Sequence, residues 1–148
     1  MLKKSLVLLG SLMLCLGCSH GKKFSTEGAK VSKNGFTLSA GWVKDKTKRF
    51  DAGINLSNDS KKPLLIEAGN VRYSHGDTEG SVTGIDGSMG VAAGGSNSFT
   101  LHCNLGTAVK GGAFKVELKK VYANPNGDAT TKGSEVASNL VLVLQPEK

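Results

Sequence analysis

Two stretches decide the fold expected of this chain: GFTLSAGW at residues 35–42 and RFDAGINLSN at residues 49–58. Both place an apolar side chain at every second position, namely Phe36, Leu38, Ala40 and Trp42 in the first and Phe50, Ala52, Ile54 and Leu56 in the second. A period of two is typical of a strand that buries one face. The charged residues between the stretches predict a turn, so we expect a hairpin with one face of each strand toward a shared core.

The same alternation returns twice later in the chain. The apolar positions are Phe99, Leu101 and Cys103 in SNSFTLHCNL (96–105) and Phe114, Val116 and Leu118 in AFKVELKKVYA (113–123). Val121 is displaced by one from the second register, which predicts a β-bulge near Lys119 and Lys120. The run NLVLVL (139–144) is apolar on both faces, so we expect it in the middle of a sheet or beneath a covering loop.

Turn-forming segments, among them NDSKKP, HGDTEG and NPNGD, separate these stretches. The glycine-rich segment SVTGIDGSMGVAAGG (81–95) predicts a weak strand around Val82 and then a mobile loop. The chain has 20 glycines and, after its leader, no window with helical spacing of apolar residues. These features predict one all-β domain over residues 35–148, an antiparallel immunoglobulin-like β-sandwich of about seven strands.

The N-terminus has the layout of a signal peptide. Lys3 and Lys4 precede an uncharged run over residues 5–17, and this run is shorter than the roughly 20 apolar residues that a membrane-spanning helix needs. The run ends in CLGC (15–18), which resembles the lipobox of bacterial lipoproteins. In that family a small residue precedes a cysteine that receives diacylglycerol and becomes the first residue of the mature protein.

The resemblance implies that residues 1–17 are removed and that Cys18 carries the lipid. Residues 18–34 are then expected to form a flexible tether, and Ser19, which is not aspartate, implies delivery to the outer membrane of a bacterial cell envelope. Ordinary secretion is one alternative. A redox or zinc pair made of Cys15 and Cys18 is another, but it would need a βαβ setting or a second ligand pair, and only Cys103 follows.

A second resemblance concerns the domain. NLSNDSKKPLLI (55–66), AAGGSNSFTLHC (92–103) and FKVELKKVY (114–122) resemble the telokin-like, immunoglobulin-fold domains found in many bacterial lipoproteins. In those domains a strand runs into a Lys-Pro turn, and a glycine-rich turn opens a strand with an aromatic residue. The resemblance implies a fold and does not imply an activity.

The charge of the chain indicates anionic partners. The net charge is +7, and removal of the leader leaves 17 basic against 12 acidic residues, a net +5. A basic surface attracts anionic polymers and lipids, although a solvated lysine-rich surface is the simpler alternative. Nucleic acid is not expected, because no aromatic residues are interleaved with the basic ones. The candidate binding residues lie in two loops that need not form one patch: Lys44, Lys46, Lys48 and Arg49, and Lys61 and Lys62.

Other candidate sites are weaker. His75, Asp77 and Glu79 alternate in YSHGDTEG (73–80) and could ligate a divalent metal, but a surface turn is the preferred interpretation. NPNGDATTKGSE (124–135) has calcium-loop spacing of its oxygen donors, but its glycine falls fourth instead of sixth, so we expect a β-turn. Cys103 shares the parity of core residues and is expected to be buried, with an intermolecular disulfide or redox sensing as the alternatives.

No pattern for nucleophilic or paired-carboxylate catalysis is present in the sequence. We therefore expect a non-enzymatic, lipid-anchored envelope protein that needs no metal or other cofactor. It would present its loops to a protein or to an anionic envelope polymer. The alternatives are a structural accessory lipoprotein without a ligand of its own, and a metal-binding or weakly enzymatic domain that uses the His75–Asp77–Glu79 loop.

Overall fold

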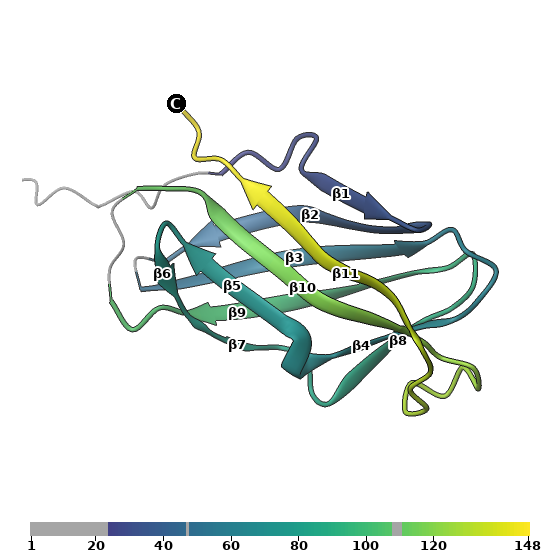
Figure 1. The fold of residues 1–148 in the computed structure, drawn as a ribbon. Helices are drawn as coiled ribbons and strands as arrows, with labels where there is room; N and C mark the ends of the chain where they lie inside the picture. Colours follow the sequence, from purple (N-terminus) through teal and green to yellow (C-terminus); the bar gives the residue numbers. More distant parts are fainter. Residues whose placement is uncertain (1–23, 47, 108–110) are drawn as a thin grey trace, which may run out of the picture.

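The computed structural model describes residues 24–46, 48–107 and 111–148, which form two antiparallel β-sheets packed face to face (Figure 1). The strands are β1 Lys30–Lys33, β2 Phe36–Asp45, β3 Arg49–Asn58, β4 Leu64–Glu67, β5 Val71–His75, β6 Thr78–Glu79, β7 Ser81–Thr83, β8 Ser88–Val91, β9 Ser96–Asn104, β10 Phe114–Ala123 and β11 Glu135–Leu144. A 3₁₀ turn, Ala68–Asn70, precedes β5. Within the described residues, no helix has the length and apolar character needed to cross a membrane. The predicted all-β sandwich is confirmed.

The two quoted stretches form the centre of the first sheet. That sheet has the order β1-β2-β3-β9-β7, and β2 pairs with β3 from Phe36 opposite Asn58 to Asp45 opposite Phe50. The predicted hairpin is therefore confirmed. The second sheet has the order β6-β5-β10-β4-β8, and β11 pairs with the other edge of β10.

The core lies between the inward faces of the two sheets. Its largest fully buried side chains are Phe36, Phe50, Phe114, Leu38, Ile54, Leu56, Leu65, Ile66, Leu101, Leu118, Leu140 and Leu142. Phe50 of the first sheet stacks on Phe114 of the second, with ring centroids 5.2 Å apart, and Phe24 meets Phe50 edge-on at 5.5 Å. Each such pair contributes about 0.5–1.5 kcal/mol beyond the burial of its area.

Trp42 departs from the alternation that predicts it. The ladder between β2 and β3 shifts register between Ala40 and Trp42, which marks a β-bulge at Gly41. The extra residue turns Trp42 to the outer face, where 45% of its area is exposed, and Val43 packs against the core instead. The predicted inward position of Trp42 is wrong.

The prediction for the C-terminal run is also wrong. β11 pairs with β10 alone among the described strands, and Val141 and Val143 are 39% and 38% exposed on its outer face. The predicted irregularity of β10 is confirmed, because the buried positions change parity between Leu118 and Val121. The ladder with β11 shifts register immediately after Val121.

The tether predicted for residues 18–34 is wrong from residue 24 onward. Phe24 is 6% exposed and forms an isolated β-bridge with Pro146. β1 pairs with β2 along its whole length, and only Val31 of this strand packs against the core. One inward side chain gives too little periodicity to reveal a strand, so the predicted domain start at residue 35 lies eleven residues too late.

The described residues form eleven strands, more than the seven or so expected, because short strands occupy segments predicted as turns or loops. The weak strand predicted around Val82 is confirmed as β7. The predicted mobile loop after it contains β8, which pairs with β4 from Ser88 opposite Glu67 to Val91 opposite Leu64. Short strands at sheet edges limit pairing with other chains.

We predict that Phe24→Ala lowers the free energy of unfolding by about 3 kcal/mol, because the buried ring packs against both Phe50 and Phe114. Urea denaturation followed by circular dichroism measures the change. Glu27→Ala, at an exposed position of the same segment, is the control and should shift stability by less than about 0.5 kcal/mol. Equal stability of the two variants would show that this segment is a tether after all.

Candidate functional site

The outer face of the β1-β2-β3-β9-β7 sheet, here called the polar face, is covered by short hydrogen-bonding side chains. They alternate with the core positions of each strand and are Ser32, Thr37, Ser39, Asn55, Ser57, Ser81, Thr83, Ser96, Ser98, Thr100 and Asn104. The charged outward positions are Lys30, Lys44, Arg49 and Asp51. The face is therefore a hydrogen-bonding surface with more cations than anions.

Asp51 is the centre of a charge cluster at one end of the polar face. Its carboxylate lies 2.6 Å from Lys46 Nζ, 2.8 Å from Arg49 Nε and 2.8 Å from His102 Nδ1. Arg49 Nη2 also lies 2.8 Å from His102 Nδ1. The Asp51 side chain is 7% exposed, whereas its three partners are 42–47% exposed. The acid is covered and the basic groups reach the surface.

The cluster keeps Asp51 ionised. Burial is the largest single effect on this carboxyl and favours the neutral acid, but the hydrogen bonds from His102, Lys46 and Arg49 together outweigh it. They hold the pKa of Asp51 well below its usual range. A carboxylate that stays ionised is a poor proton donor near neutral pH. The arrangement suits a fixed, positively charged anion site better than acid–base chemistry.

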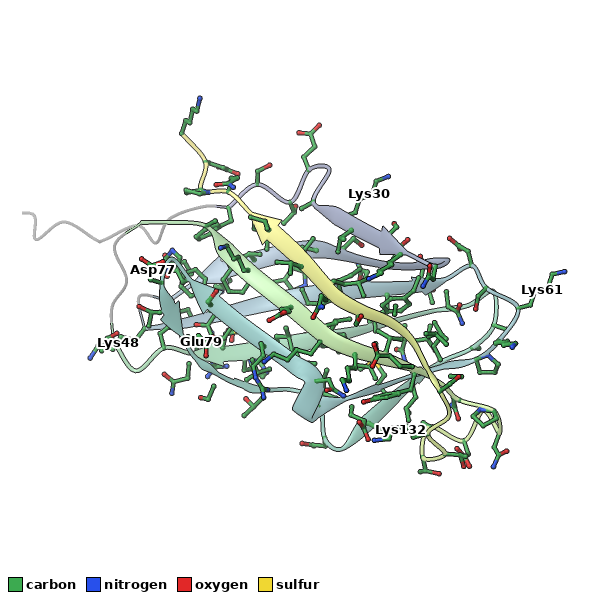
Figure 2. The ribbon with its side chains drawn as sticks, in the orientation of Figure 1. Lys30, Lys48, Lys61, Asp77, Glu79 and Lys132 are labelled. Atoms are coloured by element: carbon green, nitrogen blue, oxygen red, sulfur yellow. The ribbon has the colours of Figure 1, made fainter. Side chains whose placement is uncertain are left out.

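The predicted basic residues do not form one patch. Lys44, Lys46, Lys48 and Arg49 lie at the β2–β3 turn, whereas Lys61 and Lys62 lie at the other end of β3. Figure 2 shows Lys48 and Lys61 at opposite ends of the molecule. Two of the four residues at the first end are also engaged by Asp51.

The sandwich is almost balanced in charge. Its described residues contain 14 Lys and Arg against 12 Asp and Glu, a net +2. The other basic residues of the predicted mature chain are Lys22, Lys23 and Lys110, which lie outside the described residues. The cationic character of the polar face is therefore local and does not follow from a basic domain as a whole.

The metal site considered for His75, Asp77 and Glu79 is not formed. His75 has the inward parity of β5 and is fully buried, with its ring 4.7 Å from that of Phe50 and its Nε2 3.2 Å from the Gly112 carbonyl oxygen. Asp77 and Glu79 are exposed at the end of the sandwich (Figure 2). No three His, Cys, Asp or Glu side chains in the described part of the chain gather so as to hold a metal ion.

Two other sequence predictions are confirmed. Cys103 is fully buried in the core, and this burial raises the pKa of its thiol to about 12, which makes the thiol unreactive. The 124–135 segment begins with a β-turn in which the Gly127 amide donates to the Asn124 carbonyl oxygen at 3.0 Å. Asp128 then accepts hydrogen bonds from the amides of Thr130 and Thr131, so its carboxylate is used within its own loop.

A hollow of about 530 Å³ lies at the far end of the molecule, between β8 and the turn after β10. Asn124 lines it and is 1% exposed, and its Oδ1 accepts no hydrogen bond from the described residues. The lining also includes Pro63, Met89 and Asn97 but no charged side chain. The hollow therefore lacks the means to attract an anionic ligand.

Sequence reasoning missed Asp51 and His102 as partners. The two residues lie 51 positions apart and meet only through the pairing of β3 with β9. The one local signal is Asp51 itself, an acid between the apolar residues Phe50 and Ala52 and two residues from Arg49.

Comparisons with known proteins support the fold. No protein-family model matches the chain, and no curated protein matches it. Among solved structures, the chain is similar to the crystal structure of YcdA, a candidate lipoprotein from Bacillus subtilis, with a TM-score of 0.54 and 15% sequence identity. The match covers 79% of this chain and 38% of YcdA. At this identity the likeness is one of fold, and this chain spans well under half of that protein.

We predict that Asp51→Asn lowers the free energy of unfolding by about 1–2 kcal/mol at neutral pH, since its partners lose their anionic acceptor but remain partly solvated. The pKa of Asp51 is lower in the folded state than its unfolded value of about 3.9, so its contribution is present above that value. It is lost as pH falls through the folded-state pKa.

Urea titrations of wild type and Asp51→Asn from neutral pH to about pH 2 test this, and the stability gap should shrink below about pH 4. Asp59→Asn, at an exposed position just after the same strand, is the control and should behave as wild type. A gap that stays constant over the whole range would contradict the assignment.

Proposed function

We propose that this chain is a cell-envelope lipoprotein, anchored by lipid on Cys18, whose sandwich is a non-enzymatic binding module. Its partner would be an anionic envelope polymer or a protein that carries anionic groups. Cys18 lies outside the described residues, so the anchor rests on the CLGC pattern, and the likeness to a candidate lipoprotein supports it. Delivery to the outer membrane and a telokin-like domain type belong to the same proposal.

The position at which the fold begins limits the distance between the lipid anchor and the sandwich. Because Phe24 is packed in the core, residues 19–23 alone connect Cys18 to the sandwich. Six residue steps span at most about 22 Å. The sandwich would then lie close to the membrane surface, and more than one acyl chain on Cys18 would make the anchoring stable.

The observation that carries the binding role is the charge of the polar face. Lys30, Lys44 and Arg49 stand at its outward strand positions with Asp51 as the single acid among them. Asp51 is covered by basic partners, so an approaching polymer meets mainly positive charge. Such attraction acts at long range and is screened by salt.

We predict that Lys30→Glu/Lys44→Glu weakens binding to polygalacturonate about tenfold or more, because each exposed charge contributes up to about 1 kcal/mol. Retention of the mature protein on the immobilised polymer at low salt measures the effect. The control is Lys115→Glu/Lys119→Glu, which makes the same change of net charge at exposed positions of β10 in the other sheet. If both double variants lost polygalacturonate binding equally, the effect would come from net charge alone, and the proposal that the polar face binds the polymer would be contradicted.

For the anchor, we predict that Cys18→Ala leaves the precursor unprocessed and unlabelled by a fatty-acid analogue in bacterial cells. Cys15→Ala should be processed and labelled as the wild type, because residue 15 is removed with the leader. Gel shift and fluorescence of the incorporated analogue report both events. Loss of labelling in Cys15→Ala alone would show that the acceptor is the other cysteine.

A further inference from the structure

Trp42 is the single tryptophan of the chain, and it lies among the short side chains of the polar face. It stands directly opposite Gly53 in the β2–β3 ladder. A Cβ atom added at Gly53 would lie 2.7 Å from both Cδ1 and Cε2 of the indole and closer still to Nε1 between them. If the edge of the indole pointed at this Cβ position, Cδ1 and Cε2 would lie behind Nε1 and clearly farther from it. Their short distances show instead that the Cβ position lies below the ring plane, so the indole lies nearly flat over the Gly53 backbone.

This geometry leaves one face of the indole for solvent. Gly53 is buried by the ring, while 45% of Trp42 remains exposed. The bulge at Gly41 turns Trp42 outward, and the absence of a side chain at Gly53 lets the ring lie down. A flat aromatic ring with a free, electron-rich face is a stacking platform.

Hydrogen-bonding groups surround this platform. Asn55 lies beside the bulge, its Nδ2 being 3.0 Å from the position that a Cβ of Gly41 would take. In the ladders, Asn55 is paired with Ser39 on one side and Ser98 on the other, and Gly53 is paired with Thr100. The platform therefore adjoins two rows of hydroxyl and amide groups that can donate as well as accept.

Positive charge lies next to the platform on the same strand. Lys44 is two residues from Trp42 on β2, a separation of about 7 Å along a strand, and is itself opposite Asp51. Arg49 and Lys46 follow at the end of the face around Asp51. A ligand stacked on Trp42 would thus find several cations toward one end and, toward the other, hydroxyl groups with one cation, Lys30, opposite Ser39.

We propose that the polar face binds an acidic polysaccharide, with one sugar ring stacked on Trp42 and its carboxylate or phosphate groups against Lys44 and Arg49. This deepens the proposed function and rests on it. The C–H face of a sugar ring packs on an aromatic face, and its hydroxyl groups find partners in Ser39, Asn55 and Thr100. The excess of cations on the face complements the acidic groups.

A polysaccharide fits this surface better than a protein does. Protein interfaces have an apolar centre, whereas Trp42 is the single large exposed apolar side chain that the described residues place on this face. The other exposed large apolar residues, Val141 and Val143, belong to β11 of the opposite sheet. An acidic peptide therefore serves as the competing ligand in the test.

The fluorescence of Trp42 reports binding directly, because no other tryptophan contributes to the emission. The mature protein in neutral detergent is titrated with three probes: a galacturonate hexasaccharide, a neutral N-acetylglucosamine hexasaccharide and a hexaglutamate peptide. We expect a saturable spectral shift with galacturonate, a weaker one with the neutral sugar and none with the peptide. An equal shift with the peptide, or none with galacturonate, would overturn the inference.

Calorimetry on variants provides the second measurement. Trp42→Ala should weaken galacturonate binding about tenfold or more, as expected when a stacked ring loses its platform. Gly53→Ala keeps the tryptophan but forces it off the sheet, and it should weaken binding as well. Val143→Ala, which removes an exposed apolar side chain from the other sheet, is the matched control and should bind as wild type.

The two proposals fail in different ways. If Trp42→Ala binds galacturonate and hexaglutamate as wild type does, while Lys30→Glu/Lys44→Glu still loses both, the sugar inference is wrong and the anion-binding function stands. If neither acidic probe binds the wild-type protein, the proposed function fails together with the inference. Circular dichroism of each variant confirms that a loss of binding is not a loss of fold.

Discussion

The packing of Phe50 against Phe114 joins the two sheets, and the rest of the structure depends on it. Phe24 closes on both rings from the N-terminal segment, and His75 is buried beside them. The described residues contain one cysteine, which is free, so no disulfide within them links the sheets. Apolar burial must therefore hold the sandwich together, and each of the long strands β2, β3, β9, β10 and β11 turns one of its faces toward that core.

The burial of the inward faces in the core leaves only the outward faces of the sheets for a ligand. Once the inward positions are taken by the core, the outward positions of the first sheet carry serine, threonine, asparagine and a few charges. Gly41 and Gly53 together determine the position of Trp42. The bulge at Gly41 turns Trp42 outward, and Gly53, which lies opposite and has no side chain, lets the indole ring lie flat. Two glycines on neighbouring strands thus convert a core residue of the expected pattern into a surface platform.

Local pattern predicted much of the fold because strand parity is a property of neighbouring residues. It predicted the β2–β3 hairpin, the burial of Cys103 and the turn after Asn124. It was wrong where the cause lies outside the segment. β11 is apolar on both faces and still forms an edge, and His75 lies in a polar-looking loop sequence but points into the core. The order of strands in a sheet and the burial of a residue at the end of a strand depend on contacts with distant segments. A short stretch of sequence carries no information about those contacts.

The sequence by itself determined that the chain forms an antiparallel sandwich and which residues of most strands face inward, because alternation and turn chemistry act over a few residues. The tertiary structure alone decided that Asp51 meets His102 and that Trp42 lies over Gly53. It also decided that residues 24–34 belong to the domain and that the two basic loops lie apart. These features depend on strand register and sheet order, which arise only when segments far apart in the chain pack together.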